Sequence, residues 1–230
     1  MKEKKRSNNI ASSYFELNEL ITRVFCDATP PGQIDAAYLF AETPDNEVSV
    51  FEAGSFLYDM KLIKKVAICK FKKALGYLGS KNWLRKLVAM GVIEKDVEKI
   101  PPGRDFPPST QAEALGLVRF AMQKGWKSIY IVAPPLHQLR AFITTINEVV
   151  KEKSKLKVYS FPGLPQKWGD CIVHSQGVHK GTRSNFLGME LKKIEKYYRK
   201  GDLISTKSIL TYLDARDQVE LLNEDLEPKK

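Results

Sequence analysis

Residues 129–150, IYIVAPPLHQLRAFITTINEVV, carry the strongest fold signal in the chain. The first five residues form a short, continuous apolar run, which is typical of a strand buried on both faces. Two prolines follow, and Pro135 suits the first turn of a helix, where its missing N–H is not needed. Residues 136–150 then predict a helix. The segment therefore indicates a buried strand, a tight turn and a helix.

The same alternation of strand and helix extends toward the N-terminus and a short way beyond. Strands are expected at residues 34–40, 66–69, 97–100, 129–133 and 156–161, and helices at 50–60, 82–90, 109–124 and 136–150. Five strands that alternate with helices favour a parallel sheet with right-handed crossovers and helices on both faces. We therefore predict an α/β fold, a three-layer Rossmann-like sheet of about five strands.

Helical extensions are expected at both ends. Residues 13–25 have apolar residues at helical spacing, and Ser13 with Glu16 forms a capping-box pattern at its start. After Pro165, residues 168–180 read as a loop, and 186–199 and 205–217 as helices. We expect an N-terminal tail and amphipathic helix in 1–33, the Rossmann-like domain in 34–165, and a C-terminal helical appendage in 166–230, packed on that domain.

The composition is that of a folded protein, with 43% hydrophobic and 28% charged residues. The charged residues 1–6 are not followed by an apolar run, and no stretch is long enough to cross a bilayer, so we expect neither a secretory signal nor a membrane anchor. Three cysteines, an odd number, suit a reducing compartment. A soluble, cytoplasmic protein is predicted.

The net charge of +10 favours contact with polyanions, phosphorylated metabolites or an anionic membrane surface. Some of the lysines belong to the chain ends, and others cluster between Lys61 and Lys73 around one expected strand. Two interpretations follow: a solvated basic surface that maintains solubility, or a stripe that binds a polyanion such as nucleic acid.

Two loops are the places to search for a site, because open parallel sheets bind ligands beyond the carboxyl ends of their strands, near helix amino ends. In the first loop, residues 104–113, Thr110 and Glu113 match a capping box that would open the next helix. In the second loop, His137 and Arg140 are three residues apart and share one helix face. This pair either binds an anion or has structural roles, with Arg140 tied to a carboxylate.

The motifs together resemble the YdcF/SanA/ElyC-like family. The resemblance covers residues 34–162 and rests on Asp35 at the first strand, Gly91-Val92 before a strand, Thr-x-x-Glu-Ala at 110–114, and Pro-x-His-x-x-Arg-Ala at 135–141. It implies a Rossmann-like domain with a pocket at the strand ends and a poorly defined reaction. On this resemblance, Thr110, Glu113, His137 and Arg140 occupy the family's pocket positions.

The resulting hypothesis is a pocket for a small anionic ligand, with nucleotide-like compounds as one candidate class. Arg140 would pair with the anion, the amides near Thr110 would assist, His137 would donate or shuttle a proton, and Glu113 would hold the cap or orient Arg140. The further ligand-binding candidates from the same two loops are Ser109, Pro135 and Arg104. A transferase or hydrolase acting on a phosphorylated compound fits this pocket. No cofactor is identified; S-adenosylmethionine or another nucleotide is a candidate.

Two hypotheses from other classes stand beside this pocket. One is a non-catalytic protein whose basic surface binds nucleic acid or an acidic protein partner. The other is an interaction scaffold that uses the C-terminal helices.

Other polar groups were weighed as sites and set aside. Cys171, His174 and His179 lack an apparent fourth ligand and a standard zinc spacing, so no metal is expected. Residues 174–177 are expected to form a loop that covers the pocket or packs on the appendage. Glu42 and Asp45 could hold a divalent ion or act as a base, but a solvated acidic loop is favoured. Glycine-rich nucleotide motifs and a hydrolase elbow are absent from the sequence.

Overall fold

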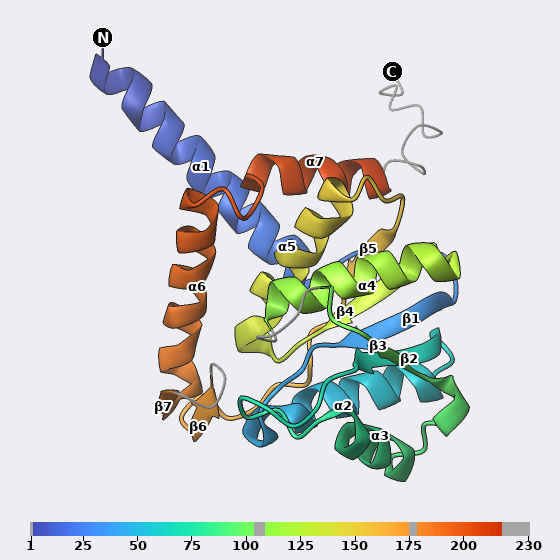
Figure 1. Cartoon of the computed structure of the whole chain (residues 1–230). Coiled ribbons are helices and arrows are strands. Elements are labelled where there is room, and N and C mark those ends of the chain that lie inside the picture. Colours follow the sequence, from blue (N-terminus) through green and yellow to red (C-terminus); the bar gives the residue numbers. More distant parts are fainter. Residues whose placement is uncertain (1, 104–108, 175–178, 218–230) are drawn as a thin grey trace, which may run out of the picture.

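A five-stranded parallel sheet forms the centre of the protein (Figure 1). The computed structural model describes residues 2–103, 109–174 and 179–217, with side chains from residue 14 onward. The strands are β1 (Ile34–Leu39), β2 (Ile63–Cys69), β3 (Val97–Ile100), β4 (Ser128–Val132) and β5 (Lys157–Ser160), in the spatial order β3-β2-β1-β4-β5. All neighbouring pairs are parallel. The predicted Rossmann-like α/β fold is confirmed.

Helices cover both faces of this sheet (Figure 1). One layer contains α2 (Pro44–Asp59) and α3 (Ser80–Ala89), and the other contains α4 (Thr110–Lys124) and α5 (Pro135–Lys151); a short 3-10 helix, Glu94–Asp96, leads into β3. In β1, Tyr38 packs in the layer of α4 and α5, whereas its neighbour Leu39 packs in the layer of α2 and α3. Because successive side chains of a strand point to opposite faces, a strand covered on both sides is apolar throughout.

The strand order reverses between β1 and β4. The chain runs from β1 through β2 to β3 on one side of the sheet and then returns to place β4 on the other side of β1. The two loops that leave β1 and β4 meet at this point, where the amide of Phe40 donates to the carbonyl of Val132 at 2.9 Å. A switch of this kind opens a crevice at the carboxyl ends of the strands.

The C-terminal part contains a hairpin that the sequence did not reveal. Strands β6 (Cys171–His174) and β7 (His179–Thr182) pair antiparallel, so the loop expected over 168–180 is wrong there. The reason is that His-Lys-Gly-Thr of β7 is polar and largely exposed, and carries no strand signal. The two expected helices are present: α6 (Arg183–Arg199) packs against α5, and α7 (Thr206–Asp217) packs against α1 and α5.

Helix α1 is longer than predicted, because it spans Lys2–Phe25. Ser13 lies inside the helix, so the expected capping box at Ser13 is wrong and residues 2–6 are not a tail. The lysines, the glutamate and the arginine that precede Ser13 are themselves good helix formers. The inner end packs into the core through Leu20 and Val24, and the other end projects from the body in Figure 1. Among the described helices, none is long and apolar enough to cross a membrane.

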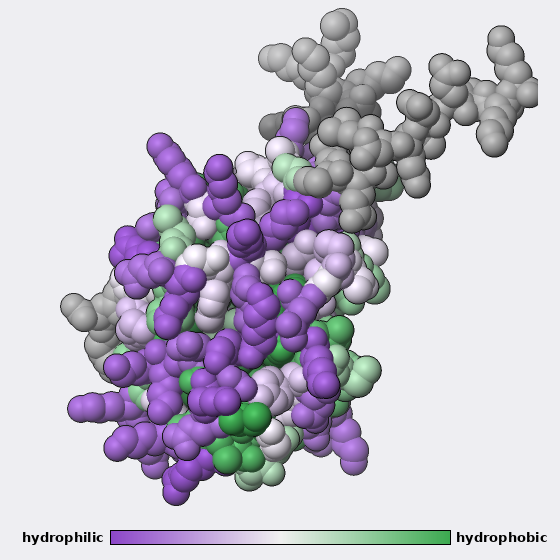
Figure 2. Space-filling view, turned by 90° about the vertical axis from the view of Figure 1, so that its right-hand side faces the viewer, coloured by the Kyte–Doolittle hydropathy of each residue, from purple (hydrophilic) through white to green (hydrophobic). Residues whose placement is uncertain are grey.

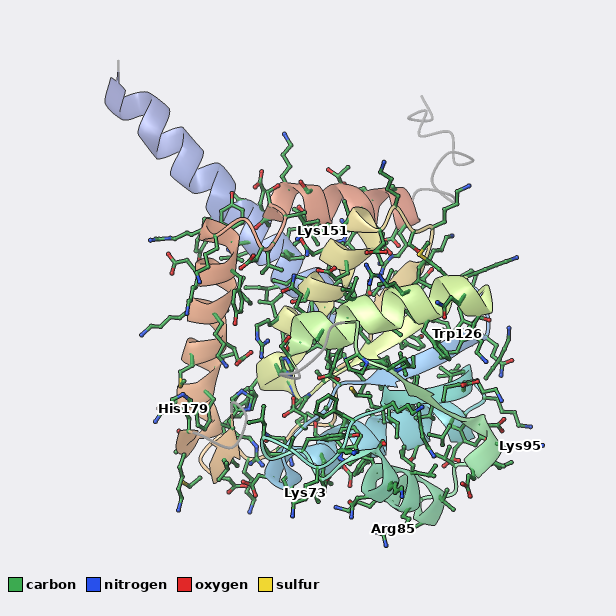
Figure 3. All side chains as sticks on the ribbon, viewed as in Figure 1. Lys73, Arg85, Lys95, Trp126, Lys151 and His179 are labelled. Atoms are coloured by element: carbon green, nitrogen blue, oxygen red, sulfur yellow. The ribbon has the colours of Figure 1, made fainter. Side chains whose placement is uncertain are left out.

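Basic residues are dispersed over the surface. Figure 2 shows a face covered mostly by hydrophilic side chains. In Figure 3, Lys73, Lys95 and Lys151 lie in different parts of the molecule. Within the expected cluster between residues 61 and 73, Lys64 pairs with Asp35 at 2.8 Å and Lys65 with Asp96 at 2.7 Å. This part of the basic surface is therefore partly neutralised.

Candidate functional site

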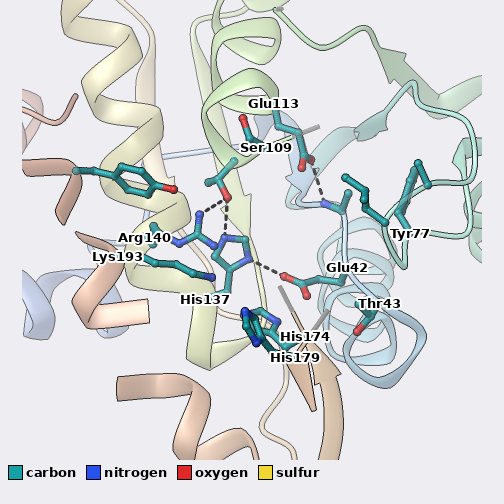
Figure 4. A pocket seen from close by; sticks show the side chains of 15 residues that line it. Glu42, Thr43, Tyr77, Ser109, Glu113, His137, Arg140, His174, His179 and Lys193 are labelled. Atoms are coloured by element: carbon teal, nitrogen blue, oxygen red, sulfur yellow. Dashed lines mark hydrogen bonds and ion pairs between the residues drawn. The ribbon is translucent and has the colours of Figure 1, made fainter. Parts of the chain in front are cut away.

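A cavity of about 440 Å³ opens where β1 and β4 lead into α2 and α5 (Figure 4). Its walls come from residues 41–43 after β1, residues 74–77 after β2, the first turns of α4 and α5, and the C-terminal hairpin with α6. The cavity therefore lies at the switch point of the sheet, and both the Rossmann-like part and the C-terminal part contribute side chains to it.

His137 is held between two polar partners in this cavity. Its Nδ1 is 2.6 Å from Oε1 of Glu42, and its Nε2 is 3.2 Å from Oγ1 of Thr110 (Figure 4). The His137 and Glu42 side chains are only 6% and 3% exposed. A neutral imidazole with its hydrogen on Nδ1 donates to Glu42 and accepts the hydroxyl hydrogen of Thr110. The three side chains then form one chain of hydrogen bonds.

The surroundings of His137 favour its neutral form. Burial and the nearby guanidinium of Arg140 lower the pKa of His137, while the hydrogen bond to Glu42 works in the opposite direction. The imidazole is therefore neutral near pH 7. In that form Nε2 is able to accept a proton from a hydroxyl group or from a ligand.

Arg140 is tied to a carboxylate from the C-terminal part of the chain. Its Nε donates to Oε2 of Glu190 in α6, and its Nη1 donates to Oγ1 of Thr110. Glu190 also accepts from Nζ of Lys193 at 2.7 Å and lies 3.2 Å from Nε2 of His174. Within the described part of the chain, these contacts leave Nη2 of Arg140 for a ligand.

Glu190 stays ionised in this cluster. Burial alone would raise its pKa, but the charge of Arg140 and the hydrogen bond from His174 outweigh burial and hold the pKa of Glu190 far below its usual range. Of the two roles that the sequence allowed for Arg140, the structural contact with a carboxylate is therefore present. The anion-binding role depends on the N–H groups that this contact does not use.

Glu113 forms the wall of the cavity opposite Arg140. Its Oε2 accepts from the hydroxyl of Tyr38 and from the amide of Ala41, both at 3.0 Å. Burial, reinforced by the negative charge of Glu42, raises the pKa of Glu113 to about 8 against the pull of these hydrogen bonds and of Arg140. Near neutral pH the carboxyl therefore retains its proton.

The predicted capping box of Thr110 and Glu113 is wrong by one residue. Ser109 is the N-cap of α4, and its Oγ accepts from the amide of Ala112 at 3.1 Å. Thr110 is the first helical residue, so its hydroxyl is free to face Arg140 and His137. Serine and threonine are both good N-caps, and the sequence pattern fits either register. Glu113 supports the loop after β1 instead of the cap.

The four principal candidates of the sequence analysis, Thr110, Glu113, His137 and Arg140, line the same cavity, together with Ser109. Pro135 is the first residue of α5, as expected, but it is not among the described residues that line the cavity. Arg104 lies outside the described residues.

No family model and no curated protein matches the chain. The resemblance to the YdcF/SanA/ElyC-like family therefore stays an expectation based on the motifs, and the arguments on function depend on the geometry of the cavity.

Sequence reasoning missed several cavity residues. Glu42 was expected in a solvated acidic loop, which is wrong, because it is 5% exposed and bonded to His137. The signal for Glu42 was its place directly after a buried strand, at the carboxyl edge of the sheet. His174, which was expected in a loop that covers the pocket or packs on the appendage, lies at the end of β6 and lines the cavity. Lys193 carried no comparable signal, because the packing of α6 against α5 brings it to the cavity.

The groups weighed as metal sites do not converge. In the hairpin, His174 pairs with His179, while Cys171 pairs with Thr182 at the other end. Asp45 accepts from the amide of Val173 at 2.7 Å rather than sharing a ligand with Glu42. Among the described residues, no three His, Cys, Asp or Glu side chains are grouped to hold a metal ion. Of the predicted covering loop, residues 175–177 lie outside the described residues.

Proposed function

We propose that the cavity binds a small anionic ligand with a phosphate group, of which nucleotide-like compounds are one class, and that His137 exchanges a proton with this ligand. One observation carries the proposal. Thr110, at the amino end of α4, is in hydrogen-bond contact with both the neutral imidazole of His137 and the charged guanidinium of Arg140, on the wall of a cavity of about 440 Å³. Pockets for small molecules typically measure about 300–1,000 Å³.

The charges on this wall favour an anion. Arg140 and Lys193 bring two positive charges to this wall, and both contact the carboxylate of Glu190. Glu42 contacts the Nδ1 side of His137, away from Thr110, and Glu113 is protonated near neutral pH. The amino end of α4 adds a partial positive charge, and the free N–H groups of a guanidinium match phosphate oxygens. The resemblance to the YdcF-like family points to the same pocket.

Binding to a set of phosphate compounds tests the proposal. Calorimetry and thermal shift with ADP and glucose 6-phosphate should identify a saturable ligand that raises the melting temperature, because a ligand that prefers the folded state stabilises it. S-adenosylmethionine, a nucleoside compound without a phosphate group, is the comparison ligand and should not bind in this way. The informative variant is Arg140→Met with Glu190→Gln, which removes both charges of the pair together. Lys95→Ala, a change at an exposed lysine far from the cavity, is the matched control.

We expect the double variant to lose at least tenfold in affinity and the Lys95 variant to bind normally. Unchanged affinity in the double variant would overturn the proposal. If affinity for every anion falls steeply with added salt and does not depend on Arg140, the basic-surface interpretation replaces it.

A further inference from the structure

We infer that Thr110 is a nucleophile whose hydroxyl attacks the phosphorus of a phosphate ester bound in the cavity, which makes the protein a phosphate ester hydrolase. This inference rests on the proposed function, since it names the reaction of the same site. It starts from the order of contacts Glu42–His137–Thr110, in which a carboxylate, an imidazole and a hydroxyl follow one another.

That order is the one that activates a hydroxyl group. A threonine hydroxyl is a weak nucleophile until a neighbouring base takes its proton, and an imidazole does this best when a carboxylate fixes its other nitrogen. Here Oγ1 of Thr110 is 3.2 Å from Nε2 of His137, and Oε1 of Glu42 is 2.6 Å from Nδ1. Because Glu42 and His137 are nearly fully buried, the imidazole is held in this orientation.

Two further features favour negative charge on the same oxygen. Nη1 of Arg140 donates a hydrogen bond to Oγ1 of Thr110, which stabilises an alkoxide. Thr110 is also the first residue of the fifteen-residue helix α4, where the helix dipole is positive. The adjacent Ser109 lies at the same helix end, but its hydroxyl caps the amide of Ala112, whereas the contacts with His137 and Arg140 go to Thr110. Of the two hydroxyls at this helix start, only that of Thr110 faces a base and a cation.

The charges around Thr110 select the electrophile. A phosphate ester carries negative charge on its non-bridging oxygens in both the ground state and the transition state, and it is stabilised by guanidinium and ammonium groups. Arg140 and Lys193 supply these groups on the wall of the cavity. A neutral carboxylic ester would gain less from them, so phosphorus is the favoured centre.

The reaction balances with water as the only co-reactant. Oγ1 of Thr110 bonds to phosphorus, its proton passes to Nε2 of His137, and the alcohol leaves with that proton as the ester O–P bond breaks. A water molecule then attacks the phosphothreonine and gives a proton to His137, and the Thr110 oxygen leaves and takes this proton back. The products are the free alcohol and inorganic phosphate.

A phosphorus electrophile tests the nucleophile directly. The full-length chain is incubated with an alkyl fluorophosphonate, and the adduct is measured by intact mass and mapped by peptide sequencing. We expect one adduct on Thr110 with loss of fluoride. His137→Gln and Glu42→Gln should slow labelling at least tenfold, Thr110→Ser should retain it, and Lys95→Ala, a change at an exposed lysine far from the cavity, should be labelled at the wild-type rate.

Three results would overturn the inference even if the protein binds its phosphate ligand. The first is an adduct on another residue, and the second is equal labelling of Thr110→Val. The third is the absence of an adduct on wild-type protein that binds its phosphate ligand by calorimetry. Loss of ligand binding by the wild-type protein is instead the failure of the proposed function. Turnover of p-nitrophenyl acetate but not of p-nitrophenyl phosphate would show that the electrophile is a carbonyl and overturn the assignment to phosphorus.

Discussion

Oε1 of Glu42 and Nδ1 of His137 lie 2.6 Å apart, although 95 positions separate the two residues in the sequence. They meet because β1 and β4 are neighbours in the sheet and each residue follows the carboxyl end of its strand. The contact couples the protonation of His137 to a buried carboxylate. It therefore links the fold directly to the acid–base behaviour of the cavity.

Replacing Glu42 by glutamine should lower the pKa of His137. Burial and Arg140 already lower this pKa, and the carboxylate of Glu42 opposes them, so removing its charge leaves the lowering effects in place. The glutamine oxygen still accepts from Nδ1, which preserves the geometry. NMR titration of the imidazole signals measures the effect, and only three histidines need assignment. Glu94→Gln, an exposed change, is the control; a pKa that rises or stays constant in the Glu42 variant contradicts the prediction.

His137 should also make the fold sensitive to acid. Its pKa is lower in the folded state than the ordinary 6.5, so the unfolded chain takes up a proton first as the pH falls. The stability that depends on neutral His137 is complete above about pH 6.5 and is lost as the pH falls toward the folded-state value. In urea unfolding between pH 7.5 and pH 5, His137→Gln should therefore show a smaller loss of stability than the wild type; an equal loss in both would refute this account.

Glu113 should give the opposite pH dependence. Its pKa rises from 4.5 to about 8 on folding, so between these values the folded state keeps a proton that the unfolded chain releases. Stability is complete below about pH 4.5 and declines as the pH rises to about 8, by at most about 1.4 kcal/mol per pH unit. Glu113→Gln keeps an acceptor for Tyr38 and Ala41 and should flatten the decline.

Glu113→Leu is the matched comparison for this measurement. It should destabilise at every pH by about 1–3 kcal/mol, because it leaves the amide of Ala41 without a buried partner. If Glu113→Gln retained the wild-type pH slope, the assignment of a protonated carboxyl to Glu113 would be wrong.

The contact of Arg140 with Glu190 should appear as strong coupling in unfolding experiments. Both side chains are largely buried, at 11% and 2% exposed, so Arg140→Met alone leaves a buried carboxylate short of a partner. We expect a cost of about 3–5 kcal/mol for this single change. Adding Glu190→Gln should recover part of that loss, and a urea double-mutant cycle measures the coupling. Strictly additive free energies would show that the pair does not interact.

The sequence predicts the sheet well because strands buried on both faces must be apolar throughout. Residues 36–39 of β1, 66–69 of β2 and 129–132 of β4 are runs of this kind. The carboxyl ends of β3 and β4 place the loops that carry Thr110, His137 and Arg140 at one edge of the sheet. The register of one helix start was missed, because Ser109 and Thr110 both suit the N-cap position. Local chemistry alone does not distinguish them, whereas the contact of Thr110 with Arg140 does.

The rest of the cavity depends on tertiary packing. Glu190 and Lys193 lie on a largely polar helix, and nothing in their spacing indicates that they face Arg140 rather than solvent. Likewise, Glu42 contacts His137 because β4, the strand that precedes His137, lies beside β1 in the sheet. Long-range packing of α6 against α5 therefore completes a site of which the sequence predicts only one side.

Gly116 should be required for the position of α4, and thereby of Thr110. A Cβ atom at Gly116 would lie 2.2 Å from the carbonyl oxygen of Pro101 and 2.8 Å from the amide nitrogen of Gly103, both of which are backbone atoms. Alanine normally favours a helix over glycine by about 1 kcal/mol, but this clash forces the helix away from residues 101–103. We expect Gly116→Ala to destabilise by about 1–3 kcal/mol.

The control for this change lies in α6. A Cβ atom at Gly188 meets nothing within 4 Å, so Gly188→Ala should stabilise by up to about 1 kcal/mol through helix propensity alone. Thermal unfolding of both variants compares the two effects, and ligand affinity reports whether Thr110 has moved with its helix. The prediction is contradicted if Gly116→Ala is as stable as Gly188→Ala and binds ligand normally. The close approach of α4 to residues 101–103 would then not determine the position of Thr110.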